Sequence, residues 1–364
     1  MQLTTLRRFE FSAARQLPNG RLYGNNFFGW LGVTGALNPS TGMLINIVEL
    51  KHALNDALDF YDHRTLNHSL PGIEPTTLNI AQSLWKDLRP LLPAHITLSE
   101  LHLEEMHEHA AHLTAERAAW VWQSGFSAAH RTHAPQLSAA ENQRLFGICN
   151  HPNGHGHNYR VQVYLPAPAQ VPHGLLTDLD HRNLSRDVPE LTGRSIVTET
   201  LCHLLAQRVP QAVSVRVWET DTFYAEYFPT QDRYELGRRY HFHAAHRLNS
   251  PALTAEENHA IFGKCNRPDP HGHTYTVLLT VGGKLDPRTE TAYDLAALDA
   301  AVQPILDELD YRYLDVEIPF FSQNPSTGEN IAAYLFERLQ TALAGALRSV
   351  QVWETANNCF VARA

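Results

Sequence analysis

Cysteine is scarce in this sequence, with four residues among 364, at positions 149, 202, 265 and 359. So few thiols in so long a chain exclude the disulfide framework that is typical of small secreted domains. The N-terminal segment lacks the apolar core of a signal peptide, and no apolar run approaches the length of a membrane span. We therefore expect a reduced, cytoplasmic protein that has no membrane partner.

Basic residues are also fewer than acidic residues in this sequence. Lys and Arg number 29 against 38 Asp and Glu, which gives a formal net charge of −9. Such an acidic molecule is not expected to bind nucleic acid, and a polyanionic small molecule would need a local basic pocket. Hydrophobic residues make up 43% of the chain and charged residues 18%, which indicates a globular protein with a substantial core.

Histidine, by contrast, is abundant, with 22 residues, and six of them fall into a layout that occurs twice. In each copy an Ala-Ala-His run is followed by a Cys and then by His-Gly-His, with the same internal spacing. The six residues are His130, His155 and His157 in the first copy and His246, His271 and His273 in the second.

The spacing of these histidines favours a metal site. Residues i and i+2 of a β-strand point to one face, so both imidazoles of His-Gly-His can reach one point. A third His from a neighbouring strand would complete a three-nitrogen set, and three imidazoles with an open position are typical of catalytic zinc. One His-Gly-His could arise by chance in a histidine-rich chain, but two matching copies indicate two zinc sites.

The histidine layout is part of a threefold internal repeat. The repeats open with FEFSAARQL, FSAAHR and FHAAHRL, and each later carries an element of the form D-x-x-x-L. We predict three units, at residues 1–115, 116–232 and 233–364. Each unit has a strand that runs into a glutamate, and these glutamates are Glu105, Glu219 and Glu354.

The fold class expected for each unit is α+β. The hydrophobic pattern predicts the order strand, strand, helix, helix, strand, strand, and Ser326 with Glu329 forms a capping-box pattern before the last helix. The second unit is short between Gly174 and Asp180, so we expect it to lack most of its first helix. Three antiparallel sheets joined edge to edge would close a ring and leave no open edge.

These motifs resemble the 6-pyruvoyl-tetrahydropterin synthase family, whose bacterial members include 6-carboxytetrahydropterin synthase. The resemblance rests on AAHRL, FGKCN-x-P-x-x-HGH-x-Y, LDH-x-NL, ST-x-EN and V-x-V-x-ET, and it covers nearly the whole chain in three copies. It implies the tunnelling fold, or T-fold, in which three subunits form one twelve-stranded barrel with helices outside. The chain resembles such a trimer fused into one polypeptide, and we expect two fused trimers to form a homodimer.

The resemblance also implies an activity and a role for each matching position. The activity is that of a zinc-dependent carbon–oxygen lyase, which acts on 7,8-dihydroneopterin triphosphate and releases triphosphate, with two Zn²⁺ per chain held by the two histidine sets. The family's catalytic cysteine corresponds to Cys149 and Cys265. The Asp-His pair that completes a triad across two subunits corresponds to Asp62-His63 and Asp180-His181. The glutamate that anchors the pterin corresponds to Glu219, Glu354 and Glu105.

Two repeats depart from the family pattern. In the first, Arg15 stands in place of the first His, and Phe28-Gly29-Trp30 is aligned with His-Gly-His, so no zinc is expected there. In the third, Asp310 is followed by Tyr311 instead of His. Suppose that the zinc and cysteine of each repeat are completed by the Asp-His pair of the preceding repeat, in cyclic order. The lost histidines of the first repeat and Tyr311 of the third repeat then belong to the same inactive site. That direction predicts His63 beside Cys149.

Two alternatives remain beside the synthase. One is a non-catalytic T-fold protein that binds pterin or zinc, because this chain has already lost one site. The other is a different T-fold enzyme, such as an aldolase acting on dihydroneopterin, which the Cys and the three-His set disfavour. The spacing from Cys149 to His155 is closer to the pyruvoyl-forming branch than to the carboxy-forming one, but it leaves the product open.

Overall fold

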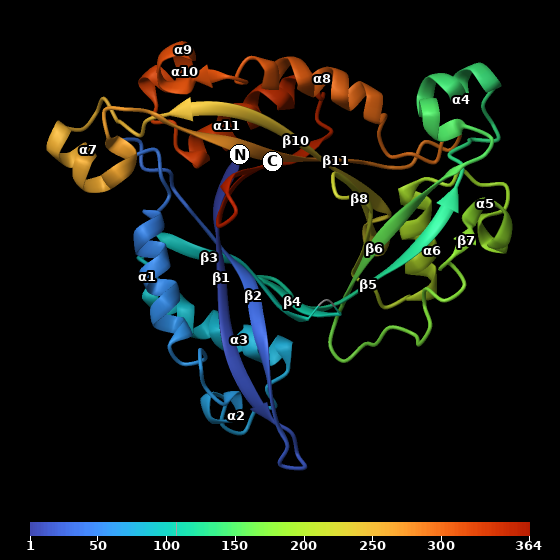
Figure 1. The fold of residues 1–364 in the computed structure, drawn as a ribbon, viewed down its shortest axis with the longest axis horizontal. Helices are drawn as coiled ribbons and strands as arrows, with labels where there is room; N and C mark the ends of the chain where they lie inside the picture. The colour runs from blue at the N-terminus through green and yellow to red at the C-terminus, as the bar shows by residue number, and fades with distance from the viewer. Residues whose placement is uncertain (107) are drawn as a thin grey trace.

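The computed structural model describes residues 1–106 and 108–364, and its centre is a closed β-barrel. Figure 1 shows the strands as a ring with the helices outside it. The barrel strands are β1 (Gln2–Gln16), β2 (Leu22–Gly35), β3 (Ile96–Met106), β4 (His109–Thr114), β5 (Ala118–His130), β6 (His155–Leu165), β8 (Ser214–Thr220), β9 (Phe223–Phe228), β10 (Arg233–His246), β11 (His271–Gly283), β13 (Leu347–Thr355) and β14 (Asn358–Arg363). Two short strands, β7 (Arg182–Asn183) and β12 (Arg312–Tyr313), pair in parallel with β5 and β10.

Helices and helical turns connect the strands. The α-helices are α1 (Ile47–Leu58), α2 (Leu66–Ser69), α3 (Thr77–Leu88), α4 (Ala139–Phe146), α5 (Leu184–Asp187), α6 (Thr198–Arg208), α7 (Ala255–Phe262), α8 (Leu295–Asp307), α9 (Leu314–Glu317), α10 (Pro319–Gln323) and α11 (Gly328–Ala342). The 3-10 turns are Arg89–Leu91, Gly147–Asn150, Pro189–Leu191, Pro229–Gln231 and Gly263–Asn266. Within the described residues, no helix is long and apolar enough to cross a membrane.

The ring closes through strand pairs between repeats. Each repeat contributes four neighbouring antiparallel strands, and the joints are β4 with β5, β9 with β10, and β14 with β1. At the last joint Gln2 lies opposite Arg363, so the two ends of the chain lie side by side. Because the ring is closed, each barrel strand among the described residues pairs with a neighbour on both sides. The predicted twelve-stranded antiparallel barrel with outer helices is confirmed.

The core lies between the outer face of the barrel and the helices. In α1 the buried positions Leu50, Ala53, Leu54, Ala57 and Leu58 form the single apolar face that the sequence periodicity predicts. The longest α-helix, α11, is buried over most of its length and packs on β13 and β14. The candidate histidines lie beyond this core, where β5 and β10 end and β6 and β11 begin.

The second repeat lacks a counterpart of α1 and α8, as predicted. Residues 166–181 form turns, with no helix, between β6 and β7. Leu175 and Leu179 of this segment are buried in the core, and Trp120 Nε1 donates to the carbonyl oxygen of Ala169 at 2.7 Å.

The predicted capping box at the start of α11 is wrong. The N-cap is Thr327, whose side chain accepts from the backbone N–H of Asn330. Glu329 is 2% exposed, and it accepts hydrogen bonds from Thr5 Oγ1 at 2.8 Å and from the Leu44 N–H at 3.3 Å. Because both donors belong to the first repeat, Glu329 joins two repeats instead of capping its own helix.

Candidate active site

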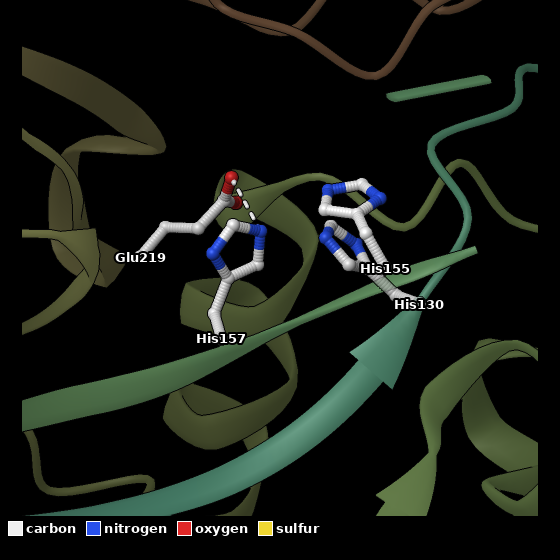
Figure 2. A group of neighbouring side chains, drawn as sticks. All are labelled: His130, His155, His157 and Glu219. Atoms are coloured by element: carbon white, nitrogen blue, oxygen red, sulfur yellow. Dashed lines mark ion pairs between the residues drawn. The ribbon is translucent and has the colours of Figure 1, made fainter. Parts of the chain in front are cut away.

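The second repeat carries a compact group of metal-ligand side chains at the end of β5 and the start of β6. Strand pairing sets His130 opposite His155, and Ala128 opposite His157. One ligand atom from each of His130, His155, His157 and Glu219 lies within 4.8 Å of the others. Figure 2 shows the three rings converging, with Glu219 beside His157, at 3.4 Å between Nε2 and Oε1. The strand periodicity therefore places the rings as predicted.

The hydrogen bonds of this group leave nitrogen lone pairs free for a metal. Nδ1 of His130 lies 2.9 Å from the carbonyl oxygen of Ile196, which can only accept, so Nδ1 carries the proton and Nε2 is the free base. The Nε2 atoms of His130, His155 and His157 are buried without a hydrogen-bond partner. Burial lowers the pKa of His130 to about 4, and it also lowers the pKa of His155. Zinc binds imidazole through a nitrogen lone pair, and these three rings converge with Nε2 atoms that make no hydrogen bond, so the residues fit a zinc ion.

The third repeat reproduces this group. His246, His271 and His273 also have ligand atoms within 4.8 Å of one another. Nδ1 of His246 donates to the carbonyl oxygen of Ser326 at 3.0 Å, and its Nε2 lies 3.3 Å from Oε1 of Glu354. The pKa values of His271 and His273 are lowered, with burial as the largest cause. The described part of the chain thus holds two candidate metal centres with matching histidines, and the grouped ligand atoms include a glutamate at the first of them.

Each candidate cysteine lies in a 3-10 turn next to its histidine set. Cys149 belongs to Gly147–Asn150 and Cys265 to Gly263–Asn266, and both are half-buried. In the metal-free chain, burial raises the pKa of both thiols, and the charges of Glu219 and Glu354 add to the shift. A neighbouring divalent cation acts in the opposite direction, because it stabilises the thiolate.

The pocket beside Cys149 is built by two repeats. Cys149, Glu219 and Phe223 of the second repeat line a cavity of about 150 Å³ together with Tyr293 and Asp294 of the third repeat. The pocket therefore joins the candidate thiol and the candidate pterin anchor, and the third repeat supplies one wall.

The third-repeat centre meets the first repeat in the same way. Asn46, at the start of α1, donates through Nδ2 to the carbonyl oxygen of Ile261 in α7, at 3.1 Å. Thr327 Oγ1 donates to the carbonyl oxygen of Gly42 at 2.5 Å. Each centre is therefore walled by the following repeat, in cyclic order.

This geometry overturns the predicted pairing of His63 with Cys149 within one chain. Asp62 and His63 are held on β1, because Asp62 Oδ1 accepts from the Ser12 N–H and the His63 N–H donates to the Ser12 carbonyl oxygen. The sheet order β1-β2-β3-β4-β5 puts β1 four strands from β5, a third of the way around the barrel and roughly 19 Å along its wall at about 4.8 Å a strand. Among the described residues, the wall of the Cys149 pocket comes from the second and third repeats alone.

Two buried glutamates were missed as site residues. Glu199 and Glu329 occupy matching positions in α6 and α11 and are each 2% exposed, and Glu199 lines the Cys149 pocket. Glu199 Oε1 accepts from the Ala292 N–H of the third repeat at 2.9 Å, just as Glu329 accepts from the first repeat. The sequence signal for them is the ST-x-EN element, whose Glu matches a helix-cap pattern equally well. Each of these glutamates joins its repeat to the following one beside a candidate centre.

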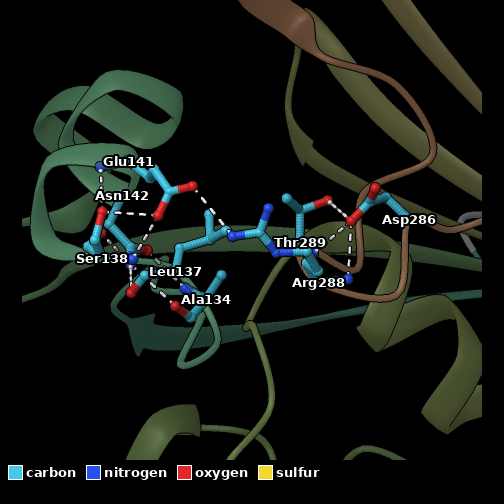
Figure 3. Close-up of polar contacts among 8 residues, drawn as sticks. All are labelled: Ala134, Leu137, Ser138, Glu141, Asn142, Asp286, Arg288 and Thr289. Carbon is cyan, nitrogen blue, oxygen red and sulfur yellow. Dashed lines mark hydrogen bonds and ion pairs between the residues drawn. The ribbon is translucent and has the colours of Figure 1, made fainter.

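An exposed contact lies next to the Glu199 junction. Arg288 of the third repeat pairs with Glu141 of α4 at 3.1 Å, and Glu141 also accepts from Ser138 in a capping box (Figure 3). The contact holds α4, which precedes Cys149, against the loop that walls its pocket.

We expect the buried glutamates to make stability fall as pH rises. Burial raises the pKa of Glu199 and of Glu329 to about 7, so each favours folding when protonated, and this stabilisation is lost between pH 4.5 and 7. Glu199→Gln with Glu329→Gln should therefore gain up to ~3 kcal/mol per site relative to the parent between pH 5 and pH 8. Urea unfolding of metal-free protein at both pH values measures this gain, and equal pH dependence in parent and variant would contradict it.

The first repeat holds an ion pair where the others hold histidines. Arg15 is buried and pairs with Glu105, the predicted pterin anchor, and Thr77 Oγ1 also donates to Glu105. The guanidinium lies over the rings of Tyr23 and Phe27, at 5.8 and 5.0 Å. The Arg15 guanidinium therefore takes the place of the metal-binding histidine and pairs with the carboxylate that would bind a pterin. This arrangement agrees with the predicted loss of the first-repeat site.

The predicted counterpart of His-Gly-His in the first repeat is wrong. Strand pairing sets Arg15 opposite Tyr23, as His130 is opposite His155. Tyr23-Gly24-Asn25 therefore replaces His-Gly-His, and Phe28-Gly29-Trp30 lies farther along β2. The central glycine is shared because a Cβ on Gly24 would lie 3.1 Å from the Ala13 carbonyl oxygen, and one on Gly156 would lie 3.2 Å from that of Ala128.

Removing Arg15 should destabilise the fold. Arg15→Met would leave the Glu105 carboxylate buried without a counter-charge, which typically costs about 3–5 kcal/mol. Arg15→Met with Glu105→Gln removes both charges and should recover most of that loss. Urea unfolding of the parent, the single variant and the double variant measures both effects, and a single variant as stable as the parent would refute the role of this pair.

Comparison with known proteins agrees with the division into three repeats. The model of a family described as 6-pyruvoyl tetrahydropterin synthase matches residues 4–116, 120–230 and 235–364. The chain belongs to the 6-pyruvoyl tetrahydropterin synthase family. Three matches in tandem show that the chain is composed of three family units.

Individual relatives match about one unit each. The 6-pyruvoyl tetrahydrobiopterin synthase of Homo sapiens is 44% identical over 129 residues, which is 35% of this chain and 89% of the human protein. The Drosophila melanogaster protein of the same name is 42% identical over 126 residues, 34% of this chain and 75% of its own length. A solved structure, the Caenorhabditis elegans 6-pyruvoyl tetrahydropterin synthase, is 38% identical, covering 36% of this chain and 96% of that chain, with a TM-score of 0.36.

Proposed function

We propose that the chain is a zinc-dependent 6-pyruvoyl-tetrahydropterin synthase that converts 7,8-dihydroneopterin triphosphate and releases triphosphate. The observation that carries the proposal is that two histidine sets each lie beside a cysteine and a glutamate, in the second and third repeats. The pyruvoyl product is favoured by the names of relatives about 40% identical to single units. The proposal also includes a cytoplasmic location and a homodimer.

Six histidines would hold the two zinc ions, one ion at each candidate centre. Bound there, zinc would supply a Lewis acid that polarises the oxygen atoms of the substrate side chain and acidifies the adjacent C–H bond. The remaining chemistry falls to the protein.

Cys149 and Cys265 would accept and return the proton, because a thiolate beside a cation has a pKa near neutrality. Glu219 and Glu354 would accept paired N–H bonds from the pterin's amino-pyrimidinone edge, as carboxylates accept from arginine. His63 and His181, each paired with an aspartate at 3.0 and 2.9 Å, would relay the proton. The Asp-His pairs of the same chain do not line the Cys149 pocket, so this relay calls for a second chain.

Incubation of the zinc-loaded chain with 7,8-dihydroneopterin triphosphate tests the proposal. We expect release of triphosphate and a tetrahydropterin product whose mass identifies the pyruvoyl form. Binding of the pterin without turnover at any pH would instead support a non-catalytic binding protein, and a product lacking the side-chain carbons would support an aldolase.

A further inference from the structure

A second cleft adjoins the Cys149 pocket. It has a volume of about 420 Å³ and lies between α4 and the cleft segment, residues 284–294, which leads into α8. Leu145, Tyr293 and Asp294 line both cavities, so the cleft continues from the side of the pocket that the third repeat supplies. A ligand that lies beside Cys149 can therefore extend into the cleft.

Three basic side chains line this cleft, and two of them have no partner. Arg288 pairs with Glu141 of α4 (Figure 3). Arg144 and Lys284 are exposed, and in the described part of the chain their side chains make no hydrogen bond and no ion pair. A polyanion that binds to a molecule with a formal net charge of −9 needs a local basic pocket of this kind.

The carboxylates of the cleft are held by backbone N–H groups. Glu141 Oε2 accepts from the N–H of its helix cap at 2.8 Å. Asp286 Oδ1 accepts from the N–H groups two and three residues ahead at 2.8 and 3.0 Å, and Asp294 Oδ1 does so at 2.9 and 3.2 Å. These three acids therefore cap a helix or close a turn, which leaves Arg144 and Lys284 available for a ligand.

The Cys265 centre has a wall with the same backbone turn. Residues 36–46 lead into α1 as the cleft segment leads into α8. Asn38 Oδ1 accepts from the N–H groups two and three residues ahead, at 2.9 and 3.3 Å, as in the cleft segment. Each turn then reaches a positive φ, 68° at Gly42 and 60° at Glu290. The two segments can therefore be compared residue by residue.

The basic side chains of the cleft have no counterpart in the wall of the Cys265 centre. Residues 36–46 and α7 contain no Lys and no Arg. The matching pairs are Arg144 with Ala260, Lys284 with Ala36, and Arg288 with Ser40. Lys264, in the 3-10 turn of Cys265, is the one Lys or Arg of α7 and that turn. The two centres therefore differ in the charge beside the cysteine, although their histidine sets match.

We propose that the cleft binds the polyphosphate of a substrate, so that the Cys149 centre holds a triphosphate ester more tightly than the Cys265 centre does. Lys and Arg bind phosphate oxygens through charge-assisted hydrogen bonds, and a planar guanidinium can bind two oxygens at once. The inference rests on the proposed function for the identity of the ester. The cleft itself can be tested with inorganic triphosphate, which presents the same groups without a pterin.

Binding of inorganic triphosphate to the metal-free chain tests the cleft, and zinc is left out because triphosphate chelates it. Isothermal titration calorimetry should show one tight site per chain. Arg144→Gln with Lys284→Gln should weaken that site at least ~30-fold, because both charged donors are lost. Both side chains are exposed and unpartnered, so the fold should not depend on them.

The matched control for this titration keeps both charges. Arg144→Lys with Lys284→Arg should bind triphosphate within about threefold of the parent. A parent chain that does not bind triphosphate, or a neutral variant that binds it as tightly as the parent, would overturn the proposal.

The corresponding substitutions at the third-repeat centre should create a second site. Ala260 and Ala36 are exposed, so Ala260→Arg with Ala36→Lys adds two cations without displacing a buried side chain. The same titration should then show two sites per chain. A stoichiometry that stays at one would contradict the assignment of these positions to a polyphosphate site.

Turnover by the Cys149 centre alone separates this inference from the proposed function. In a zinc-loaded chain with Cys265→Ser, Arg144→Gln with Lys284→Gln should raise KM for 7,8-dihydroneopterin triphosphate at least ~10-fold. It should leave kcat within about twofold, because the cleft binds substrate and transition state alike.

The two kinds of failure have different signatures. Turnover with an unchanged KM in this variant would overturn the role of the cleft and leave the proposed function standing. Triphosphate binding that depends on Arg144 and Lys284, in a chain without turnover, would uphold the cleft and reject only the proposed activity.

Discussion

The zinc-loaded chain carrying Cys149→Ser and Cys265→Ser is expected to bind zinc and pterin as the parent does, and to lose turnover by about 10²–10⁴-fold. Serine nearly preserves the size of each side chain, but its hydroxyl does not ionise near neutral pH. The thiols lie in rigid 3-10 turns and are not among the grouped ligand atoms, so metal content should not change.

The single cysteine variants serve as controls for this experiment. Each should retain about half of the activity if the two centres work independently. A double variant that keeps more than a tenth of the parent activity would show that another group moves the proton.

Pterin binding is expected to be lost in the variant with Glu219→Ala and Glu354→Ala. Removing a charged acceptor from a buried contact typically costs about 2–5 kcal/mol, or ~30-fold or more in affinity. Both carboxylates lie beside their histidine sets, with less than a fifth of each side chain exposed. Isothermal titration calorimetry of the zinc-loaded variant with a pterin measures the loss of affinity.

Glu105→Ala is the matched control for the pterin anchors. Glu105 lies at the same strand position as Glu219 and Glu354, but its carboxylate already pairs with Arg15 and accepts a hydrogen bond from Thr77. Removing Glu105 should therefore change the stability of the fold and leave pterin affinity unaltered. Equal affinity in the double variant and the parent would reject the assignment of Glu219 and Glu354.

The sequence was sufficient for the barrel and for both histidine sets, because these depend on local rules. Alternation along a strand places His155 and His157 on one face, whatever the surrounding fold. The duplicated motifs then located His130 and His246 as partners. The apolar face of α1 followed in the same way from a period of 3.6 residues.

Features that depend on pairing between distant strands were harder to predict. The hairpin joining β1 and β2 is far shorter than the connection between β5 and β6, so the counterpart of His155 lies just past the turn, at Tyr23. Aligning on the visible Phe28-Gly29-Trp30 gave the wrong register. Only the pairing of Arg15 with Tyr23 reveals the correct one.

Contacts between repeats could not be predicted from a single repeat. The motif around Glu329 is compatible with a helix cap, and nothing local shows that its carboxylate reaches Leu44 in another repeat. Likewise, the order of strands around the barrel decides that each centre is walled by the following repeat and not by the preceding one. That order is a property of the closed ring.

The zinc content of the purified chain is the most direct test of the central claim that two centres are intact and one is replaced by an ion pair. Elemental analysis should give two tightly bound zinc ions per chain, one after His157→Ala or His273→Ala, and none after both substitutions. Arg15→Met should leave the count at two, because Tyr23 and Asn25 supply no imidazole at the first centre. A count of one or three zinc ions in the parent chain would contradict the account.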